Sequence, residues 1–233
     1  MNIVITGASR GIGYHTSLLL SDQGHNVIAV SRNMENLNKL KAESQNKNRS
    51  GKLHTFTGDV TDEKSLDKIT NELKSLFSQV NVLINNAGIL INKPFDELTS
   101  NDWSNLYSTN VFGAVNMTRS VLPLMHSGSH VVNISSMGGF QGSVKFKGLS
   151  AYSSSKAALV NITECLAEEL KDRRIAVNCL CLGSVQTDMF SDAFPTMKAS
   201  LTEAEIAHFI AQFATEGQLF FNGKIIPVSN STP

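Results

Sequence analysis

Short apolar runs alternate with helical segments along most of this 233-residue sequence. The segment Glu63–Phe77 has helical periodicity, because its apolar residues recur every three or four positions. Strands that alternate with helices favour right-handed crossovers and parallel pairing. We therefore predict an α/β fold: a doubly wound, mostly parallel seven-stranded sheet with helices on both faces, a three-layer sandwich. The first six predicted strands are Ile3–Ile5, Val27–Val30, Leu53–Thr57, Val80–Asn85, His130–Ser135 and Ile175–Leu182.

The end of the sequence allows two interpretations. The stretch around Asn222-Gly223 fits a hairpin with a type I′ turn, but a last parallel strand at Lys224–Val228 agrees better with the other strands. We detect no internal repeat and no linker, so residues 1–233 are expected to form one domain. The other expected segments are the helices Ile12–Gln23, a polar helix ending near Asn46, Asp102–Met125 and Tyr152–Leu170, and a polar turn at Gln45–Lys52.

Charge and composition exclude several kinds of partner. The 20 Lys and Arg residues equal the 20 Asp and Glu residues, so no global field attracts nucleic acid or an anionic membrane surface. No apolar run approaches the roughly 20 residues that span a bilayer. Cys165, Cys179 and Cys181 lie in apolar runs and are expected to be buried, reduced thiols. We expect a cytoplasmic protein without a metal site, in which most of the six histidines lie at the surface.

A glycine-rich loop follows the first apolar run. Gly7, Gly11 and Gly13 lie between a predicted strand and the start of a helix, in the order Thr6-Gly7-Ala8-Ser9-Arg10-Gly11-Ile12-Gly13. Glycine permits positive φ and a close approach of the backbone to a pyrophosphate, whose charge the helix N-terminus stabilises. A plain tight turn is the alternative, but the place at the first strand–helix junction favours a phosphate loop.

The residues after the second predicted strand bear on cofactor choice. Dinucleotide-binding folds often place an acidic residue there for the ribose 2′-hydroxyl, whereas this sequence has Ser31 and Arg32. A guanidinium pairs with a 2′-phosphate, so NADP(H) is expected to be preferred, with NAD(H) left open. Arg10 could make the same contact. The alternative is that both arginines are solvated surface charges.

A phenol and an amine lie four residues apart in Tyr152-Ser153-Ser154-Ser155-Lys156, on one helical face. Hydride transfer to a carbonyl leaves an alkoxide, which needs a proton donor. Tyr152 is the natural donor, and a neighbouring Lys156 ammonium would lower its pKa. The Ser136 hydroxyl can hold the substrate oxygen.

These motifs, in this order, resemble those of the classical short-chain dehydrogenase/reductase family, which has a Rossmann-like fold. The resemblance covers the sequence from Met1 to about Val228 and rests on Thr6–Gly13, Asn85-Asn86-Ala87-Gly88, Asn110, Ser136 and Tyr152-x-x-x-Lys156. It implies an NAD(P)-dependent oxidoreductase that acts on a carbonyl or secondary alcohol and forms a homodimer or homotetramer. The catalytic residues that it implies are Asn110, Ser136, Tyr152 and Lys156, with Asn110 anchoring a water that links Lys156 to solvent. Between the two serines the resemblance favours Ser136, and the Ser135 side chain is expected to be turned away.

The resemblance also implies a set of cofactor contacts. Asp59 and Val60 would bind adenine, the Asn86–Gly88 stretch would pass the adenosine ribose, and Lys156 would hold the nicotinamide ribose. The loop Gly183–Thr187 would contact the nicotinamide carboxamide, with Thr187 as the hydrogen-bonding side chain. The full expected set is Gly7, Ser9, Arg10, Gly11, Ile12, Gly13, Ser31, Arg32, Asp59, Val60, Asn86, Ala87, Gly88, Tyr152, Lys156, Gly183, Val185 and Thr187.

The sequence departs from the family pattern in three places. Lys145–Lys147 extends the loop before Tyr152 and is expected to form a wall of the substrate pocket, Leu182 replaces a usual proline, and the segment Ser229–Pro233 replaces a glycine-rich ending. The short segment Met189–Thr202 predicts a modest lid. An apolar pocket is expected from Met137, Phe140, Phe190 and Phe194.

The substrate class is left open at this stage. The sequence does not choose among 3-oxoacyl thioesters, small ketones, steroid-like alcohols and sugars. The alternative function is a nucleotide-binding sensor or scaffold of the same fold without turnover, which would be free to lose Tyr152.

Overall fold

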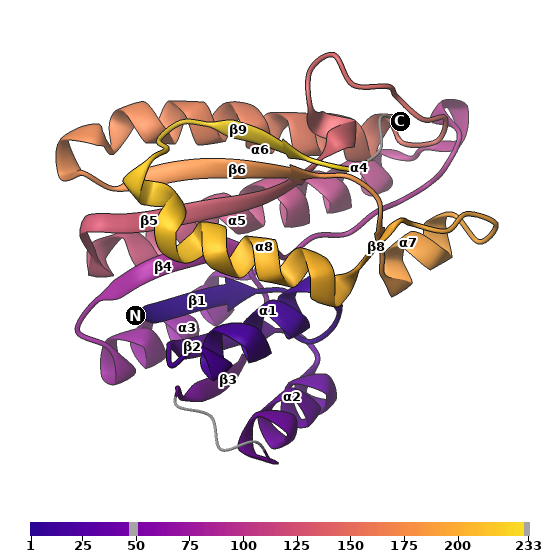
Figure 1. The fold of residues 1–233 in the computed structure, drawn as a ribbon. Helices are drawn as coiled ribbons and strands as arrows, with labels where there is room; N and C mark the ends of the chain where they lie inside the picture. The colour runs from indigo at the N-terminus through magenta and orange to yellow at the C-terminus, as the bar shows by residue number, and fades with distance from the viewer. Residues whose placement is uncertain (47–50, 231–233) are drawn as a thin grey trace.

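The computed structural model describes residues 1–46 and 51–230, and its centre is one parallel sheet of seven strands (Figure 1). The strand order is β3-β2-β1-β4-β5-β6-β9, and each neighbouring pair is parallel. This arrangement confirms the predicted doubly wound α/β fold. The strands are β1 (Asn2–Thr6), β2 (Asn26–Ser31), β3 (Leu53–Thr57), β4 (Val80–Asn85), β5 (Met125–Ser136), β6 (Ala176–Leu182) and β9 (Ile225–Val228).

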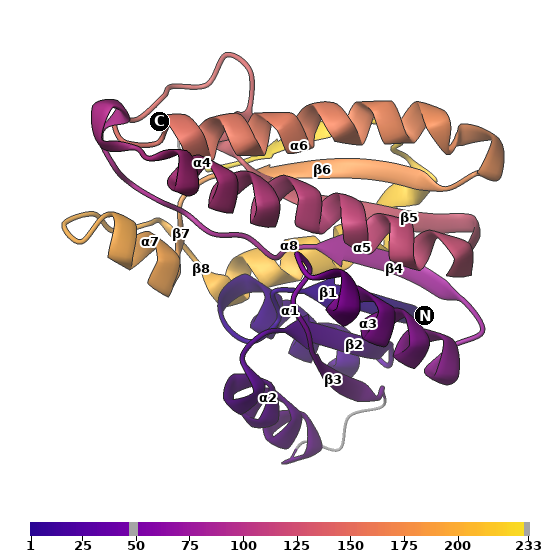
Figure 2. The same cartoon turned by 180° about the vertical axis from the view of Figure 1, so that it is seen from behind.

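Helices cover both faces of the sheet, as the two opposite views show (Figures 1 and 2). One face carries α1 (Gly11–Asp22), α2 (Met34–Asn46) and α8 (Glu203–Glu216). The opposite face carries α3 (Glu63–Leu76), α4 (Ser100–Tyr107), α5 (Gly113–Val121) and α6 (Ser150–Glu169). No helix in the described part of the chain is long and apolar enough to cross a membrane.

Two buried clusters lie on the two faces of the sheet, because successive residues of a strand point to opposite faces. Ile3 and Ile5 of β1 pack with the apolar residues of α1, α2 and α8. Val4, between them, packs with α3, α5 and α6 on the other face. The inner strands β1, β2 and β4 are therefore buried on both sides, which explains why they are nearly continuous apolar runs rather than alternating ones.

The end of the chain forms the parallel strand rather than the hairpin. Ile225 of β9 pairs with Cys179 of β6 in parallel register, and Asn222-Gly223 is the turn that enters β9, with Gly223 at φ +67°. The hairpin interpretation is therefore wrong. The departure predicted at the C-terminus falls partly outside the described residues, because residues 231–233 lie beyond them. Residues 47–50 of the predicted polar turn Gln45–Lys52 also lie outside them, whereas Gln45 and Asn46 belong to α2.

The long helix predicted at Asp102–Met125 is wrong in its continuity and in its end. Helix α4 stops at Tyr107, a π-helical turn spans Ser108–Phe112, and α5 follows from Gly113 to Val121. Pro123 then lies in a single 3-10 turn, and Met125 already belongs to β5. Proline has no backbone N–H to donate, which is consistent with the helix ending there.

Two cysteines match their prediction and one does not. Cys179 and Cys181 are buried, free thiols of β6, whereas Cys165 is exposed on the outer side of α6. An apolar neighbourhood in sequence does not specify which side of a helix faces the sheet, and this is why Cys165 was predicted wrongly.

The carboxyl ends of the strands form the edge where a ligand would bind. The chain turns to opposite faces of the sheet after β1 and β4, which are neighbours in the strand order, and such a switch point opens a crevice. The short strands β7 (Val185–Gln186) and β8 (Leu201–Thr202) form a separate parallel pair beside this edge, next to α7 (Asp188–Ala193).

Candidate active site

The glycine-rich loop has the backbone geometry of a phosphate cradle. Gly7 has φ +67° and Gly11 has φ +63°, values that side-chain-bearing residues rarely adopt. Gly13 has an ordinary φ, but a Cβ there would lie 2.6 Å from Asn86 Nδ2 and from the carbonyl oxygen of Gly7. Glycine is therefore required at Gly13 for packing between the loop and β4, not for exposure to a ligand.

Hydrogen bonds join the residues that follow β4 to the same loop. Asn86 donates through Nδ2 to the carbonyl oxygens of Thr6 and Gly7, at 3.0 and 3.2 Å. The Thr6 hydroxyl in turn accepts the backbone N–H groups of Asn86 and Ala87. These bonds hold the Asn86–Gly88 stretch beside the glycine loop, where the sequence predicted it.

The basic residues at the edge of the cleft are exposed and face carboxylates. Arg32 Nη1 lies 3.7 Å from Asp59 Oδ2, and Arg10 Nη1 lies 3.9 Å from Asp188 Oδ2. The Ser31 hydroxyl donates to Ser9 at 2.7 Å, which joins the end of β2 to the glycine loop. Both guanidiniums are well exposed, so a phosphate could replace these carboxylate contacts at little desolvation cost.

A single cleft of about 330 Å³ brings together nearly all the predicted site residues. It runs from the glycine loop and the ends of β2 and β3 to Ser136, Tyr152 and Lys156, and the Gly183–Thr187 loop borders it. Two predicted residues do not line it: Gly13, which packs beneath the loop, and Asn110, which is buried behind Lys156.

The two serines at the end of β5 face different surroundings. Ser135 is buried and donates to the backbone carbonyl oxygen of Lys156 at 2.9 Å, so its hydroxyl is used inside the fold. The Ser136 hydroxyl accepts the backbone N–H of Gly138 and lies within hydrogen-bonding reach of the Tyr152 phenol. This difference is the one that the sequence analysis predicted.

The Lys156 ammonium is almost fully buried. It donates to the carbonyl oxygen of Ile134 at 2.9 Å and lies 6.0 Å from the centroid of the Tyr152 ring. Burial lowers the pKa of Lys156 to about 8, because desolvation disfavours its charge.

The pKa of Tyr152 differs from its prediction. Burial raises the pKa of this phenol, although the ring keeps some contact with the cleft, and the hydrogen bond from Ser136 only partly offsets that effect. The expected lowering by Lys156 was wrong for this structure, because the Lys156 Nζ atom is directed at the Ile134 carbonyl oxygen.

Asn110 lies within the π-helical turn, and both polar atoms of its amide have hydrogen-bond partners. Its Oδ1 accepts the N–H of Ile89 at 2.8 Å, and its Nδ2 donates to the carbonyl oxygen of Ile89 and to Ser155, both at 3.0 Å. Gly88 separates Asn110 from Lys156, since a Cβ there would lie 3.2 Å from Oδ1 and 3.4 Å from Nζ.

The far end of the cleft is apolar. Phe146 of the extended loop meets Phe194 edge-on at 6.4 Å between ring centroids, and Phe190 of α7 lies 5.3 Å from Phe194. Met137 also lines this wall, as predicted. The prediction for Phe140 was wrong, because its side chain lines a neighbouring groove with Lys145 and Lys147.

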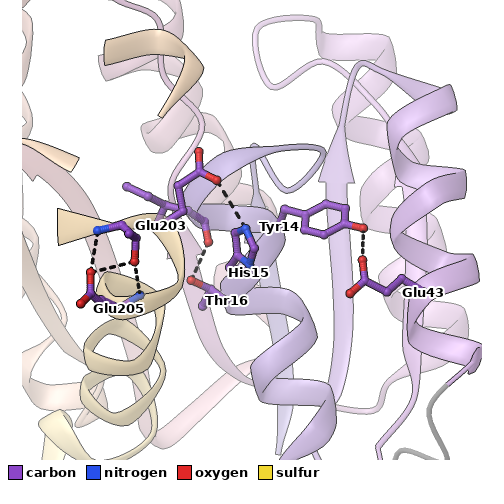
Figure 3. A network of polar contacts seen from close by, with 8 residues as sticks. Tyr14, His15, Thr16, Glu43, Glu203 and Glu205 are labelled. Carbon is purple, nitrogen blue, oxygen red and sulfur yellow. Dashed lines mark hydrogen bonds and ion pairs between the residues drawn. The ribbon is translucent and has the colours of Figure 1, made fainter. Parts of the chain in front are cut away.

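Sequence reasoning missed two polar clusters. Glu203, the first residue of α8, lines the cleft and lies 3.4 Å from His15 of α1 (Figure 3). His130 is fully buried and hydrogen-bonds to Asn178 and to the carbonyl oxygen of Ala214. The capping pattern Thr202-x-x-Glu205 could have located the start of α8, but no local signal pairs Glu203 with a residue nearly two hundred positions away.

Within the described residues, no group of three or more His, Cys, Asp or Glu side chains is arranged to hold a metal ion. The residues of the cleft fit a dinucleotide instead. Gly7 precedes α1 and Gly11 is its first residue, and both have positive φ. The N-terminus of α1 has no side-chain cap of its own, so its N–H groups are available to a phosphate.

The fold and this cleft define a dinucleotide-binding α/β protein, and comparisons with known proteins identify the family. A short chain dehydrogenase family model matches residues 1–198. The chain is 34% identical to a 3-oxoacyl-(acyl-carrier-protein) reductase of Thermotoga maritima, over 80% of this chain and 74% of the relative. A protein of the same name from Aquifex aeolicus is 30% identical, over 97% of this chain and 94% of the relative.

A solved structure agrees at the level of the fold. A short chain dehydrogenase from Burkholderia cenocepacia, described in complex with NADP, superposes with a TM-score of 0.88 at 24% identity, covering 99% of this chain and 96% of that one. The chain belongs to the short-chain dehydrogenase/reductase family. It is therefore an NAD(P)-dependent oxidoreductase.

Proposed function

We propose that this chain transfers a hydride between NADP(H) and a carbonyl or secondary alcohol substrate, with Tyr152 as general acid and base. One observation carries the proposal: a single cleft is lined by the glycine loop and Arg32 at one end and by Ser136, Tyr152 and Lys156 at the other. The bound dinucleotide supplies or accepts the hydride, and the chain supplies the proton and the position of the substrate.

The roles of the catalytic side chains follow from their surroundings. Ser136 holds the substrate oxygen, and Tyr152 donates a proton to it during reduction and removes that proton during oxidation. Lys156 is protonated at neutral pH, because its lowered pKa of about 8 still lies above 7. Its ammonium holds the nicotinamide ribose. Asn110 anchors a water that supplies protons to Lys156, and the missing side chain at Gly88 supports this role because it leaves space between the two residues.

A preference for NADP(H) over NAD(H) is supported by the charges at the end of β2. Arg32 is exposed, and within the described residues it lies at ion-pair distance from a single carboxylate, that of Asp59, at 3.7 Å. A 2′-phosphate carries more charge than that carboxylate and offers more oxygens to the guanidinium. The solved Burkholderia relative was determined with NADP, which agrees with this preference. Asp59, Val60 and the Gly183–Thr187 loop complete the proposed cofactor contacts.

The substrate that fits the cleft best is an apolar carbonyl compound. Met137, Phe146, Phe190 and Phe194 give the wall beyond Tyr152 few hydrogen-bonding groups for a sugar. An acyl chain or a small ketone would bury apolar surface there. The two relatives named above are 3-oxoacyl reductases, so a 3-oxoacyl thioester is one such candidate.

We also propose a cytoplasmic homodimer or homotetramer in which residues 1–233 form one domain. Leu219 and Phe220 are 72% and 77% exposed just before β9, which is the edge strand of the sheet. Large apolar side chains that are exposed together favour burial against another copy. The measurement is the solution mass, with Phe220→Ser expected to weaken the assembly.

The alternative is a sensor or scaffold that binds the dinucleotide without turnover. The set of Ser136, Tyr152 and Lys156 around one cleft argues against it, because binding alone does not need a phenol beside a hydroxyl. The two functions differ in one simple observation, which is oxidation of NADPH in the presence of a carbonyl compound.

The test is a panel of carbonyl compounds, assayed by NADPH oxidation with wild-type protein and with Tyr152→Phe. Loss of the proton donor should reduce turnover by about 100-fold or more while NADPH binding is retained. Tyr107→Phe is the matched control, because Tyr107 stacks on Trp103 and does not line the cleft. Comparable turnover by Tyr152→Phe would refute the assignment of the donor.

A further inference from the structure

Glu203 places a carboxylate inside the dinucleotide cleft. It is the first residue of α8, and its side chain turns toward the glycine loop rather than along its own helix. A Cβ added at Gly11 would lie 3.3 Å from Glu203 Oε1, and the next-nearest group, the methyl of Thr187, would be 4.0 Å away. The side chain is only 23% exposed, so this carboxylate is held against the N-terminus of α1.

The partner of Glu203 is an imidazole from α1. His15 Nε2 lies 3.4 Å from Glu203 Oε2, and Figure 3 shows the two side chains meeting between α1 and α8. His15 lies one helical turn after Gly11, on the helix whose N-terminus would receive the pyrophosphate. The pair therefore places two ionisable groups, a carboxylate and an imidazole, beside the phosphate loop.

Several other charged groups lie around the pair of Glu203 and His15. Arg10 faces it from the glycine loop and Asp188 from the start of α7, and these two lie 3.9 Å apart. Glu205, two residues further along α8, accepts hydrogen bonds from the backbone N–H and the hydroxyl of Thr202. On the far side of His15, Glu43 of α2 accepts a hydrogen bond from Tyr14, outside the cleft (Figure 3).

The ionised Glu203 carboxylate would repel another anion bound at the N-terminus of α1. The N-terminus of α1 stabilises one anion, and its first turn contains no acidic residue of its own. The ionised Glu203 occupies the surroundings of Gly11, which a pyrophosphate with two negative charges would also approach. Because the Glu203 side chain is only 23% exposed, solvent screens this repulsion less than it would between two surface charges.

We infer that Glu203 and His15 form a proton-binding pair within the dinucleotide site, and that the dinucleotide binds with uptake of a proton by this pair. The proton comes from solvent and neutralises the pair, either at the carboxylate or at the imidazole. Burial already raises the pKa of Glu203, and the nearby Asp188 carboxylate raises it further, while His15 and Arg10 lower it. This inference rests on the dinucleotide site proposed above and adds a residue that limits affinity at high pH.

The experiment is calorimetric titration with NAD⁺, which has no phosphate monoester. NADP(H) is unsuitable, because its 2′-phosphate titrates near pH 6 and would add its own pH dependence. Between about pH 8 and about pH 6, the affinity of wild-type protein for NAD⁺ should rise at least about threefold. Titrations in two buffers of different ionisation enthalpy should show net proton uptake.

Glu203→Gln removes the charge and keeps the shape of the side chain. It should bind NAD⁺ at about pH 8 at least about threefold more tightly than wild type, with most of the pH dependence lost. Lys156 also titrates in this cleft, with a pKa of about 8, and its contribution remains in the variant, so the difference between the two proteins isolates Glu203.

Glu43→Gln is the matched control, because it removes a carboxylate of the same network outside the cleft, and it should behave as wild type. Wild-type binding that is tight at every pH, or an equal pH dependence in Glu203→Gln, would overturn the inference and leave the proposed function intact. Failure of wild type to bind either NAD⁺ or NADP⁺ at any pH would overturn both. Thermal unfolding of each variant without ligand shows that a change in affinity is not a loss of fold.

Discussion

The Lys156 ammonium donates to the carbonyl oxygen of Ile134, 2.9 Å away, at the buried end of β5. This contact satisfies one of its three donors, and no carboxylate within the described residues lies at ion-pair distance from it. Burial lowers its pKa to about 8, which means that the charged ammonium destabilises the folded state.

Lys156→Met should therefore inactivate the protein and yet increase its stability at neutral pH. We expect the free energy of unfolding to rise by about 1 kcal/mol, since the gain from removing a buried charge exceeds the loss of one hydrogen bond. Chemical denaturation at pH 7 measures this. Lys171→Met is the control, because Lys171 is exposed and its change should stay within about 0.5 kcal/mol.

The same residue predicts the sign of a pH effect. The folded pKa of about 8 lies below the unfolded value of about 10.4, so the unfolded state binds more protons between these limits. Wild-type stability should rise with pH across that window relative to Lys156→Met, and the gap between the two should close. A constant gap from pH 7 to pH 10 would contradict the assigned pKa.

Gly88→Ala tests the space between Asn110 and Lys156. The backbone of Gly88 does not need glycine for its φ, but the new methyl would lie 3.2 Å from Asn110 Oδ1 and 3.4 Å from Lys156 Nζ. Turnover should fall about tenfold or more, because displacements of about 1 Å in a site have such effects, while stability changes by about 1 kcal/mol or less.

Gly128→Ala should show the opposite pattern to Gly88→Ala. Gly128 has φ +87° and no atoms near its missing Cβ, far from the cleft, so stability should fall by about 1 kcal/mol with turnover unchanged. Kinetic assays and denaturation of both variants measure the two effects. Equal activity losses in the two proteins would show that the space at Gly88 has no special role.

Arg32→Gln tests the basis of the cofactor preference. Removing the guanidinium should weaken NADPH binding about tenfold or more and leave NADH binding nearly unchanged, because only NADPH carries the 2′-phosphate. Fluorescence titration with both cofactors measures the ratio. Arg119→Gln, an exposed arginine of α5 away from the cleft, should change neither affinity.

His130 predicts a loss of stability in mild acid. Its Nε2 accepts a hydrogen bond from Asn178, whose orientation is fixed because its amide also bonds to the carbonyl oxygen of Phe221 and to the N–H of Lys224. In protonated His130 the Nε2–H group would point at the Asn178 Nδ2 donor, and no hydrogen bond could form between them. Burial accordingly lowers its pKa to about 4.

The folded pKa of His130 lies below the unfolded value of about 6.5, so its contribution to stability is complete above that value and is lost as the pH falls toward 4. The full effect is on the order of 3 kcal/mol. His130→Gln should show a correspondingly smaller decrease between pH 7 and pH 4. His208→Gln, which replaces an exposed histidine of α8, should keep the wild-type decrease.

Phe194→Ala tests the apolar wall of the substrate end. Without its contacts to Phe146 and Phe190, KM for apolar ketones should rise about tenfold while kcat changes little, because the ring binds substrate and transition state alike. Phe95→Ala is the control, since that ring is 73% exposed outside the cleft. An unchanged KM would place the substrate elsewhere in the cleft.

Local patterns predicted most of the fold. Apolar runs such as Ile3–Ile5 and Val80–Asn85 became neighbouring buried strands, because residues buried on both faces must be apolar whatever lies further along the chain. The spacing of Tyr152 and Lys156 placed them on one face of α6, because one helical turn separates them. The resemblance in motifs located the cleft residues, and all but Gly13 and Asn110 line it.

The sequence by itself determined the strands, the glycine loop and the order of the motifs, since these depend on residues that are close along the chain. Only the tertiary structure decided that Lys156 donates a hydrogen bond to the Ile134 carbonyl oxygen, that Asn110 accepts one from the Ile89 N–H, and that Glu203 reaches the loop at Gly11. Such contacts depend on the register of strands and the angles between helices. Their energy is realised only when distant segments pack together, so no local pattern records them.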